Sequence, residues 1–273
     1  MKYAIIDIGE LGWSLYQSGH ALWLKRQGHS VIAFTYKDRM ALYKNRVDEV
    51  KPVPQSFITQ FGAYSQDGAG LRGIKGYSIW SLFKALLPAG YQIDYGLDCD
   101  WELPKRAIYE PYEVDDEFFT KPRILVFPRC RKEEGFDFRN LSEEFYLKLC
   151  KSLCEIHPDK FITAIGSIKG AYGLKNIQAS NFDNWIGATQ DLQALINVCS
   201  SSIASIGGTS APPKIALLQG VPTFIIGHEK QRFTIDENWS KTRVGFYEIE
   251  KENYQNFNID DCINKIKEFI NAD

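Results

Sequence analysis

The segment with the clearest chemistry lies between Ile203 and Lys214 and reads IASIGGTSAPPK. Its glycines would let a ligand approach the backbone closely, and N–H groups at a helix start attract phosphate. Because Pro212 and Pro213 have no N–H, hydroxyl groups would have to replace the missing donors. An ordinary, well-capped strand-to-helix connection is the alternative interpretation. The predicted diphosphate-binding residues are Gly207, Gly208, Thr209, Ser210 and Lys214.

A second group of polar residues follows other predicted strands. Arg129 and Arg131 come directly after the apolar run ILVF, at the expected carboxyl end of a strand. Arginines at such positions suit bidentate contacts with phosphate, although a solvated charged loop is the alternative. His228 and Glu229 follow a later strand and could meet a ribose or a base. We therefore add Arg129, Arg131 and Glu229 to the predicted donor-binding residues.

The first predicted strand, residues 2–8, is followed by the sequence GELGWS. It has only G-x-x-G in place of the full dinucleotide fingerprint, but its position suits a ligand loop. Gly9, Gly12 and Trp13 are predicted to form an acceptor-side loop. Glu10 is the predicted catalytic base, because a carboxylate at a strand's carboxyl edge could accept a proton. A solvated turn acid is the alternative for Glu10.

Metal ligands are sparse in this sequence. None of its six cysteines forms a C-x-x-C pair, and the pattern indicates free, buried thiols. Asp98 and Asp100 form a D-C-D triplet, the one place where a divalent ion could be argued, and we interpret it as coincidence. The sequence therefore predicts no metal and no cofactor besides a nucleotide-sugar substrate.

The elements that must position these residues form two series of alternating strands and helices. The first series begins with strands at 2–8 and 30–34. The second has strands at 123–128, 161–165, 202–206 and 221–226, with helices that begin after Ser142, Asp191 and Asn258. We predict an α/β fold with an N-terminal lobe at residues 1–118 and a C-terminal, nucleotide-binding lobe at 119–273, joined through a linker at 114–122.

The composition and charge of the chain argue against some classes of function. The chain has 273 residues, of which 44% are hydrophobic, and a formal net charge of -2. Without a clustered basic face, nucleic acid is not an expected partner. No signal peptide and no apolar stretch of about 18 residues is evident, so we expect a cytoplasmic protein. The aromatic segment 77–91 predicts a core helix; its alternative is a helix at an acceptor cleft or at the inner membrane face, with peripheral contact.

Three stretches carry a family resemblance. They are IIDIGELGWSLYQSGHALWLKRQGHSV at 5–31, RCRKEEGFDFRNLSEEFYLKL at 129–149, and the segment 189–227 that ends in LLQGVPTFIIG. Together they resemble glycosyltransferases of the GT-B architecture, and most nearly the ADP-heptose–lipopolysaccharide heptosyltransferase family. The resemblance implies two facing, doubly wound Rossmann-like lobes, with the N-terminal lobe reduced.

The resemblance also implies residue roles. Pro212 matches the Pro of the family's D-T-G-P-x-H loop, which holds the donor diphosphate. In this register Thr209 falls on the Asp, Ser210 on the Thr, Ala211 on the Gly and Lys214 on the His. Trp13 stands where the family has its catalytic Asp, so Glu10 is the nearest replacement.

The function that follows is a metal-independent hexosyl- or heptosyltransferase of polysaccharide biosynthesis. It would move a sugar from a nucleotide-diphosphate sugar to a glycan, lipid-linked or other acceptor. A nucleotide- or glycan-binding module of the same fold that has lost catalysis is the alternative, favoured by Trp13. An NAD-type oxidoreductase is a third hypothesis, disfavoured by the incomplete glycine fingerprint.

Overall fold

The computed structural model describes residues 1–8, 11–53, 83–94, 107–115, 121–132, 137–188, 191–228, 230 and 242–272. These residues form two compact units, Met1–Glu113 and Val114–Asp273. The division between the units lies at the start of the predicted linker 114–122. The sequence analysis placed it a few residues later, between 118 and 119. Among the described residues, no helix combines the length and the apolar character needed to cross a membrane.

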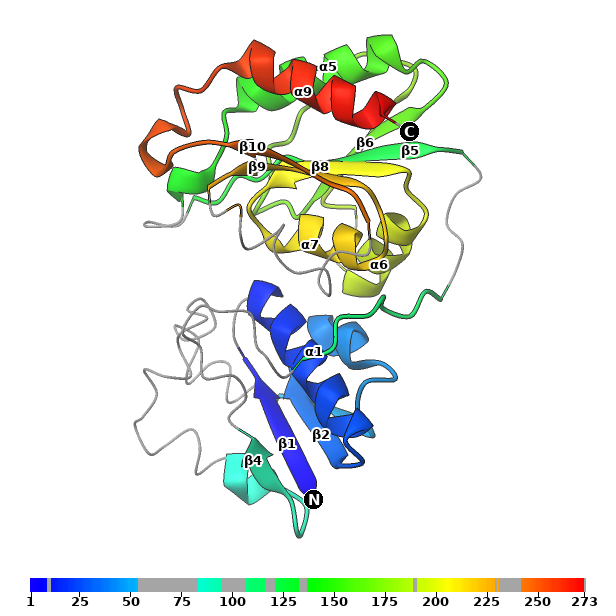
Figure 1. The fold of residues 1–273 in the computed structure, drawn as a ribbon, viewed down its shortest axis with the longest axis vertical. Helices are drawn as coiled ribbons and strands as arrows, with labels where there is room; N and C mark the ends of the chain where they lie inside the picture. Colours follow the sequence, from blue (N-terminus) through cyan, green and yellow to red (C-terminus); the bar gives the residue numbers. More distant parts are fainter. Residues whose placement is uncertain are drawn as a thin grey trace. The chain divides into compact units, whose positions relative to one another are not determined.

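The N-terminal unit is built on a four-stranded parallel sheet in the order β3-β2-β1-β4 (Figure 1). Its elements are β1 (Lys2–Asp7), α1 (Leu11–Arg26), β2 (Ser30–Thr35), η1 (Lys37–Tyr43), β3 (Glu49–Pro52) and β4 (Gln92–Asp94). One face of the sheet packs Ile6 and Phe34 against Phe83, which lies in the segment predicted as a core helix. Alternate residues of the strands pack toward α1 and η1, so both faces are covered.

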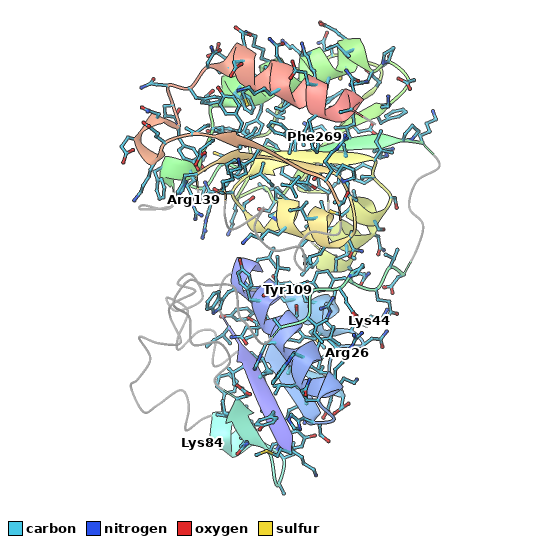
Figure 2. The ribbon with its side chains drawn as sticks, in the orientation of Figure 1. Arg26, Lys44, Lys84, Tyr109, Arg139 and Phe269 are labelled. Atoms are coloured by element: carbon cyan, nitrogen blue, oxygen red, sulfur yellow. The ribbon has the colours of Figure 1, made fainter. Side chains whose placement is uncertain are left out.

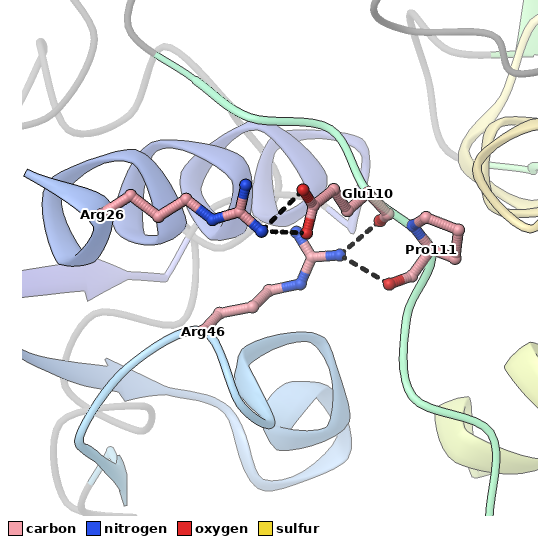
Figure 3. Close-up of polar contacts among 4 residues, drawn as sticks. All are labelled: Arg26, Arg46, Glu110 and Pro111. Carbon is pink, nitrogen blue, oxygen red and sulfur yellow. Dashed lines mark hydrogen bonds and ion pairs between the residues drawn. The ribbon is translucent and has the colours of Figure 1, made fainter.

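The segment 107–113 is held against the N-terminal unit by two arginines (Figure 3). Arg46, only 4% exposed, donates from Nη2 to the carbonyl oxygens of Glu110 at 2.5 Å and Pro111 at 3.3 Å. Its guanidinium lies 4.2 Å from the ring centre of Tyr112. Arg26, at the end of α1, pairs with the Glu110 carboxylate at 2.7 Å. Backbone carbonyls and a side-chain carboxylate thus both receive cationic donors.

The C-terminal unit has a six-stranded sheet in the order β10-β9-β8-β5-β6-β7, with every pairing parallel. Figure 1 shows α5 and α9 over one face of this sheet and α6 and α7 over the other. The elements are β5 (Arg123–Phe127), η3 (Asp137–Arg139), α5 (Glu143–Ile156), β6 (Phe161–Gly166), β7 (Phe182–Ile186), α6 (Leu192–Ser200), β8 (Ala204–Gly208), α7 (Ala211–Leu218), β9 (Thr223–Gly227), β10 (Val244–Glu248), η4 (Lys251–Asn253) and α9 (Ile259–Asn271).

The predicted helix starts in this unit are confirmed by their capping hydrogen bonds. The Ser142 side chain accepts a hydrogen bond from the Phe145 backbone N–H at the start of α5. The Asp191 and Asn258 side chains each accept from a backbone N–H in the first turn of α6 and α9, respectively. The sequence analysis did not identify β7 and β10, which are the two edge strands of the sheet. Their residues are mostly half-buried, so they lack the continuous apolar run of the central strands.

Candidate functional site

Arg129 lies just beyond the carboxyl end of β5 and is only 7% exposed. Its Nη1 donates to Oδ1 of Asn140 at 2.6 Å. Burial and, to a smaller extent, the positive charges of Arg139 and Arg131 together lower the pKa of Arg129 to about 10. Arg131 and Arg139 therefore lie close enough to Arg129 to influence its pKa.

Arg139 connects this cluster to the segment that the sequence singled out. From the end of η3, its Nη1 approaches the Thr209 carbonyl oxygen at 3.5 Å (Figure 2 labels Arg139). Thr209 is 4% exposed. Within the part of the chain that the structure describes, the buried atoms Arg139 Nε and Thr209 Oγ1 have no hydrogen-bond partner. Buried polar atoms without partners are costly, so these two atoms are candidates for contact with a polar ligand.

Ser210 is the N-cap residue of α7, but its hydroxyl does not cap the helix. Its Oγ instead donates to the Gly208 carbonyl at 3.4 Å. Lys214 lies one turn further along α7 and is 7% exposed. The start of α7 therefore offers few backbone donors, as its prolines predicted, and only hydroxyl and cationic side chains could supplement them as ligands for an anion.

The predicted turn at Gly207 and Gly208 is wrong, because both glycines are the last residues of β8. Gly207 pairs with Phe127 of β5 and Ile225 of β9, and Gly208 pairs with Ile226. A Cβ on Gly207 would lie 2.7 Å from Cγ of Pro213, whereas one on Gly208 would meet nothing closer than 3.7 Å. Gly207 thus lets α7 pack closely on the sheet, and the turn itself is confined to Thr209 and Ser210.

The two glycines are expected to respond differently to substitution. Gly207→Ala should lower the free energy of unfolding by about 1–3 kcal/mol, because Pro213 and the backbone of α7 must move. Gly208→Ala should change stability by less than about 1 kcal/mol. Urea denaturation of both variants checks this, and equal losses would contradict the packing role of Gly207.

His228 and Tyr254 contact each other near Arg129. No sequence motif had indicated this contact. The buried Tyr254 Oη lies 2.9 Å from the His228 backbone N and 2.6 Å from its Nδ1. Gly227 has a φ of +150°, and a Cβ there would lie 2.5 Å from Tyr254 Oη. Phe138 packs against both rings and remains 37% exposed. Glu229, predicted to bind the donor, lies outside the described residues.

The predicted acceptor-side loop is corrected in the N-terminal unit. Gly12 and Trp13 lie in the first turn of α1, which begins at Leu11, rather than in a loop. The half-buried Trp13 ring contacts Tyr16 edge-on, with ring centres 5.7 Å apart, as expected one helical turn away. Gly9 and the predicted base Glu10 lie outside the described residues, so their roles stay predictions.

Asp7 lies at the carboxyl end of β1, and its carboxylate is fully buried. The sequence analysis did not predict a buried acidic residue at this position. Ser14 and Thr35 each donate a hydroxyl hydrogen bond to it at 3.0 Å, and Arg39 donates to Ser14 Oγ at 3.0 Å. Burial raises the pKa of Asp7, and the nearby Arg39 charge and the hydroxyl donors oppose this. Its apolar flanks, YAII and IG, gave no signal of a buried acid.

The raised pKa of Asp7 predicts a pH dependence of stability. The unfolded carboxyl titrates near pH ~3.9, so the contribution of Asp7 is fully present below that pH and is lost as pH rises through the folded pKa. We expect the stability of the wild type minus that of Asp7→Asn to fall with rising pH by about 1.4 kcal/mol per unit across that interval. Urea denaturation of both proteins from pH 4 upward measures it. A difference that grows with pH would contradict the assignment.

No group of three or more His, Cys, Asp or Glu side chains that could hold a metal ion occurs among the described residues. The D-C-D triplet at Asp98 and Asp100 lies outside them.

No family model matches this sequence, and no curated protein matches it. Solved structures, however, match over nearly the whole chain. E. coli ADP-heptose lps heptosyltransferase II aligns at a TM-score of 0.66 with 16% identity, over 99% of this chain and 98% of that chain. A glycosyl transferase of family 9 from Veillonella parvula DSM 2008 aligns at 0.64 with 12% identity, over 98% and 97%. E. coli heptosyltransferase WaaC with ADP aligns at 0.60 with 9% identity, over 98% and 100%.

The chain has the fold of these glycosyltransferases. Its two parallel sheets with flanking helices correspond to the two Rossmann-like lobes of the GT-B architecture. The predicted fold class and the resemblance to heptosyltransferases are confirmed at this level.

Proposed function

We propose that this chain is a glycosyltransferase that moves a sugar from a nucleotide-diphosphate sugar to a glycan or lipid-linked acceptor. The observation that carries the proposal is the position of Arg129, Arg131 and Arg139 near the carboxyl ends of β5 and β8, where Arg139 approaches the Thr209 carbonyl oxygen. Thr209 Oγ1 has no hydrogen-bond partner among the described residues. In open parallel sheets this edge is where ligands bind. A diphosphate would satisfy both the buried hydroxyl and the mutually repelling arginines.

The leaving nucleoside diphosphate gains negative charge as the bond to the sugar breaks. Fixed guanidinium groups in a partly desolvated site stabilise that charge more than water does, and they need no reorganisation during the reaction. Lys214 adds a further cation near the start of α7. We therefore propose that these side chains, and not a divalent metal, offset the charge of the leaving group. Activity that survives EDTA supports this, and activity lost to EDTA and restored by one added metal contradicts it.

The catalytic base in this proposal is Glu10, which would accept the proton of the acceptor hydroxyl. Glu10→Gln should abolish transfer while donor binding is retained, and retained transfer would reject Glu10 as the base. The proposal includes a cytoplasmic location and a role in polysaccharide biosynthesis.

The decisive experiment is a thermal shift of the purified protein with UDP-, GDP-, ADP- and CMP-sugars and with NAD. A nucleotide-diphosphate sugar should raise Tm, since a ligand that binds only the folded state stabilises it. Lys214→Ala should reduce that shift. Stabilisation by NAD alone would reject the transferase and favour an oxidoreductase.

One observation favours a second candidate, a binding module of the same fold without catalysis. An indole, Trp13, occupies the position where the resembling family carries its catalytic acid, and it packs on Tyr16 within α1. A nucleotide sugar that binds but is neither hydrolysed nor transferred to any acceptor supports this candidate.

A further inference from the structure

Ile168 is a large apolar residue that the fold leaves 70% exposed. It lies in the turn that follows β6, where the Gly170 backbone N–H donates to the Ser167 carbonyl oxygen at 3.1 Å. Its side chain covers Gly187, because a Cβ built on that glycine would overlap Cγ1 of Ile168. Gly187 directly follows β7 and has a φ of +81°. Ile168 therefore rests on the backbone at the end of the neighbouring strand and exposes most of its surface.

Backbone contacts fix this turn beside the proposed diphosphate site. The Cys130 N–H donates to the Gly170 carbonyl oxygen at 2.8 Å, and an antiparallel bridge joins Arg129 to Ala171. Both segments follow strands that run parallel to each other, β5 and β6, so they lie at the same edge of the sheet. Ile168 is thus placed next to the segment that carries Arg129.

Phe138 is the other exposed large apolar side chain at this edge, within the described part of the C-terminal unit. Its ring, however, is already contacted by cations, with Lys251 Nζ at 5.1 Å and Arg139 Cζ at 5.7 Å from the ring centre. Such surroundings suit a ligand group that carries charge or hydroxyls. Ile168 instead presents an aliphatic surface, which favours contact with the apolar face of a planar ring.

We propose that the Ile168 side chain, resting on Gly187, is the surface against which the nucleobase of the donor packs. This inference rests on the proposed function and deepens it, because it assigns the side of the diphosphate on which the nucleoside lies. The base is joined to the diphosphate through one ribose, so it must bind beside the arginine segment, where Ile168 lies. An aliphatic side chain contacts the face of the base and not its hydrogen-bonding edge, so this contact supports purines and pyrimidines alike.

A comparison of pyrophosphate with a nucleoside diphosphate isolates the contribution of the nucleoside. Calorimetry measures the affinity for pyrophosphate and for whichever of ADP, GDP and UDP the wild type binds most tightly. We expect Ile168→Ser to bind the nucleoside diphosphate about 5- to 10-fold more weakly, because less apolar surface is removed from water, and to bind pyrophosphate unchanged. Ile168→Leu, which keeps the apolar area, should retain the wild-type affinity for both ligands.

Ile203→Ser is the matched control. Ile203 is 40% exposed and directly precedes β8, at the amino edge of the same sheet. This variant should leave both affinities unchanged. Phe138→Ser tests the opposite orientation of the donor, and we expect it to keep the wild-type ratio of the two affinities.

The outcomes separate this inference from the proposed function. A wild type that binds neither pyrophosphate nor any nucleoside diphosphate overturns the proposed function. A wild type that binds a nucleoside diphosphate, with Ile168→Ser binding it equally well, overturns only the role of Ile168. The same holds if Ile168→Ser weakens both ligands equally, if Ile168→Leu is as weak as Ile168→Ser, or if Phe138→Ser alone removes the preference for the nucleoside diphosphate.

Discussion

Replacing Arg129 with methionine is expected to weaken binding of nucleoside diphosphates and of pyrophosphate by about 100-fold or more, while the ligand-free protein stays as stable as wild type or becomes more stable. The loss follows from charge-assisted hydrogen bonds, each worth roughly 1.5–3 kcal/mol. The expected stability follows because burial of the Arg129 charge, the largest cause of its lowered pKa, and repulsion from Arg139 and Arg131 both disfavour the charged side chain in the ligand-free site. Methionine retains most of the apolar stem that fills the buried position.

Arg123→Met is the control for this experiment. Arg123 lies at the opposite end of the same strand, is 9% exposed and pairs with Asp183 at 2.5 Å. Its loss should lower stability and leave the affinity for pyrophosphate unchanged. Calorimetry and thermal melts of both variants measure the two quantities. An Arg129→Met protein that is destabilised and still binds pyrophosphate normally would show that Arg129 is a structural arginine.

Replacing Arg46 with methionine is expected to have the largest effect on the stability of the N-terminal unit, a loss of about 2–4 kcal/mol in the free energy of unfolding. The variant leaves the carbonyl oxygens of Glu110 and Pro111 without their donor and removes the cation beside the Tyr112 ring (Figure 3). Burial lowers the pKa of Arg46, but electrostatic interactions with Tyr112 and Glu110 oppose this, as expected for a buried cation held by its partners.

Arg26→Met provides the comparison. The Arg26 side chain is 52% exposed and pairs with Glu110, which is 37% exposed, so its loss should cost less than about 1 kcal/mol. Urea denaturation and hydrogen exchange of the amides in 107–112 measure both effects. Arg46→Met should speed exchange in this segment far more than Arg26→Met does. Equal effects would mean that the segment is held by the surface ion pair instead.

The structural features behind these predictions differ in how far the sequence alone could predict them. The strand-and-helix alternation, the caps at Ser142, Asp191 and Asn258, and the place of Arg129 after an apolar strand could all be predicted. Each depends on neighbouring residues, because a side chain caps or follows an element only a few positions away. The edge strands β7 and β10 could not be predicted from the sequence, since half-buried strands lack a continuous apolar run.

The turn before α7 shows where local reasoning fails. Two consecutive glycines indicated a ligand-binding turn, but Gly207 and Gly208 continue β8, because Gly207 pairs with both β5 and β9 and Gly208 pairs with β9. The requirement for glycine at position 207 comes from Pro213 and Phe127, whose atoms occupy the space of a Cβ. That packing exists only once the sheet has formed.

By itself, the sequence determined the two strand-and-helix series and placed glycines, hydroxyls and arginines at the carboxyl ends of strands. Only the tertiary structure decided which of these groups meet. Arg139 reaches Thr209 across 70 positions, and Gln255 reaches Asn140 across 115. Such contacts depend on the order of strands in the sheet, which local periodicity does not contain. The burial of Asp7 among hydroxyl groups has the same origin, because Thr35 comes to it from the neighbouring strand.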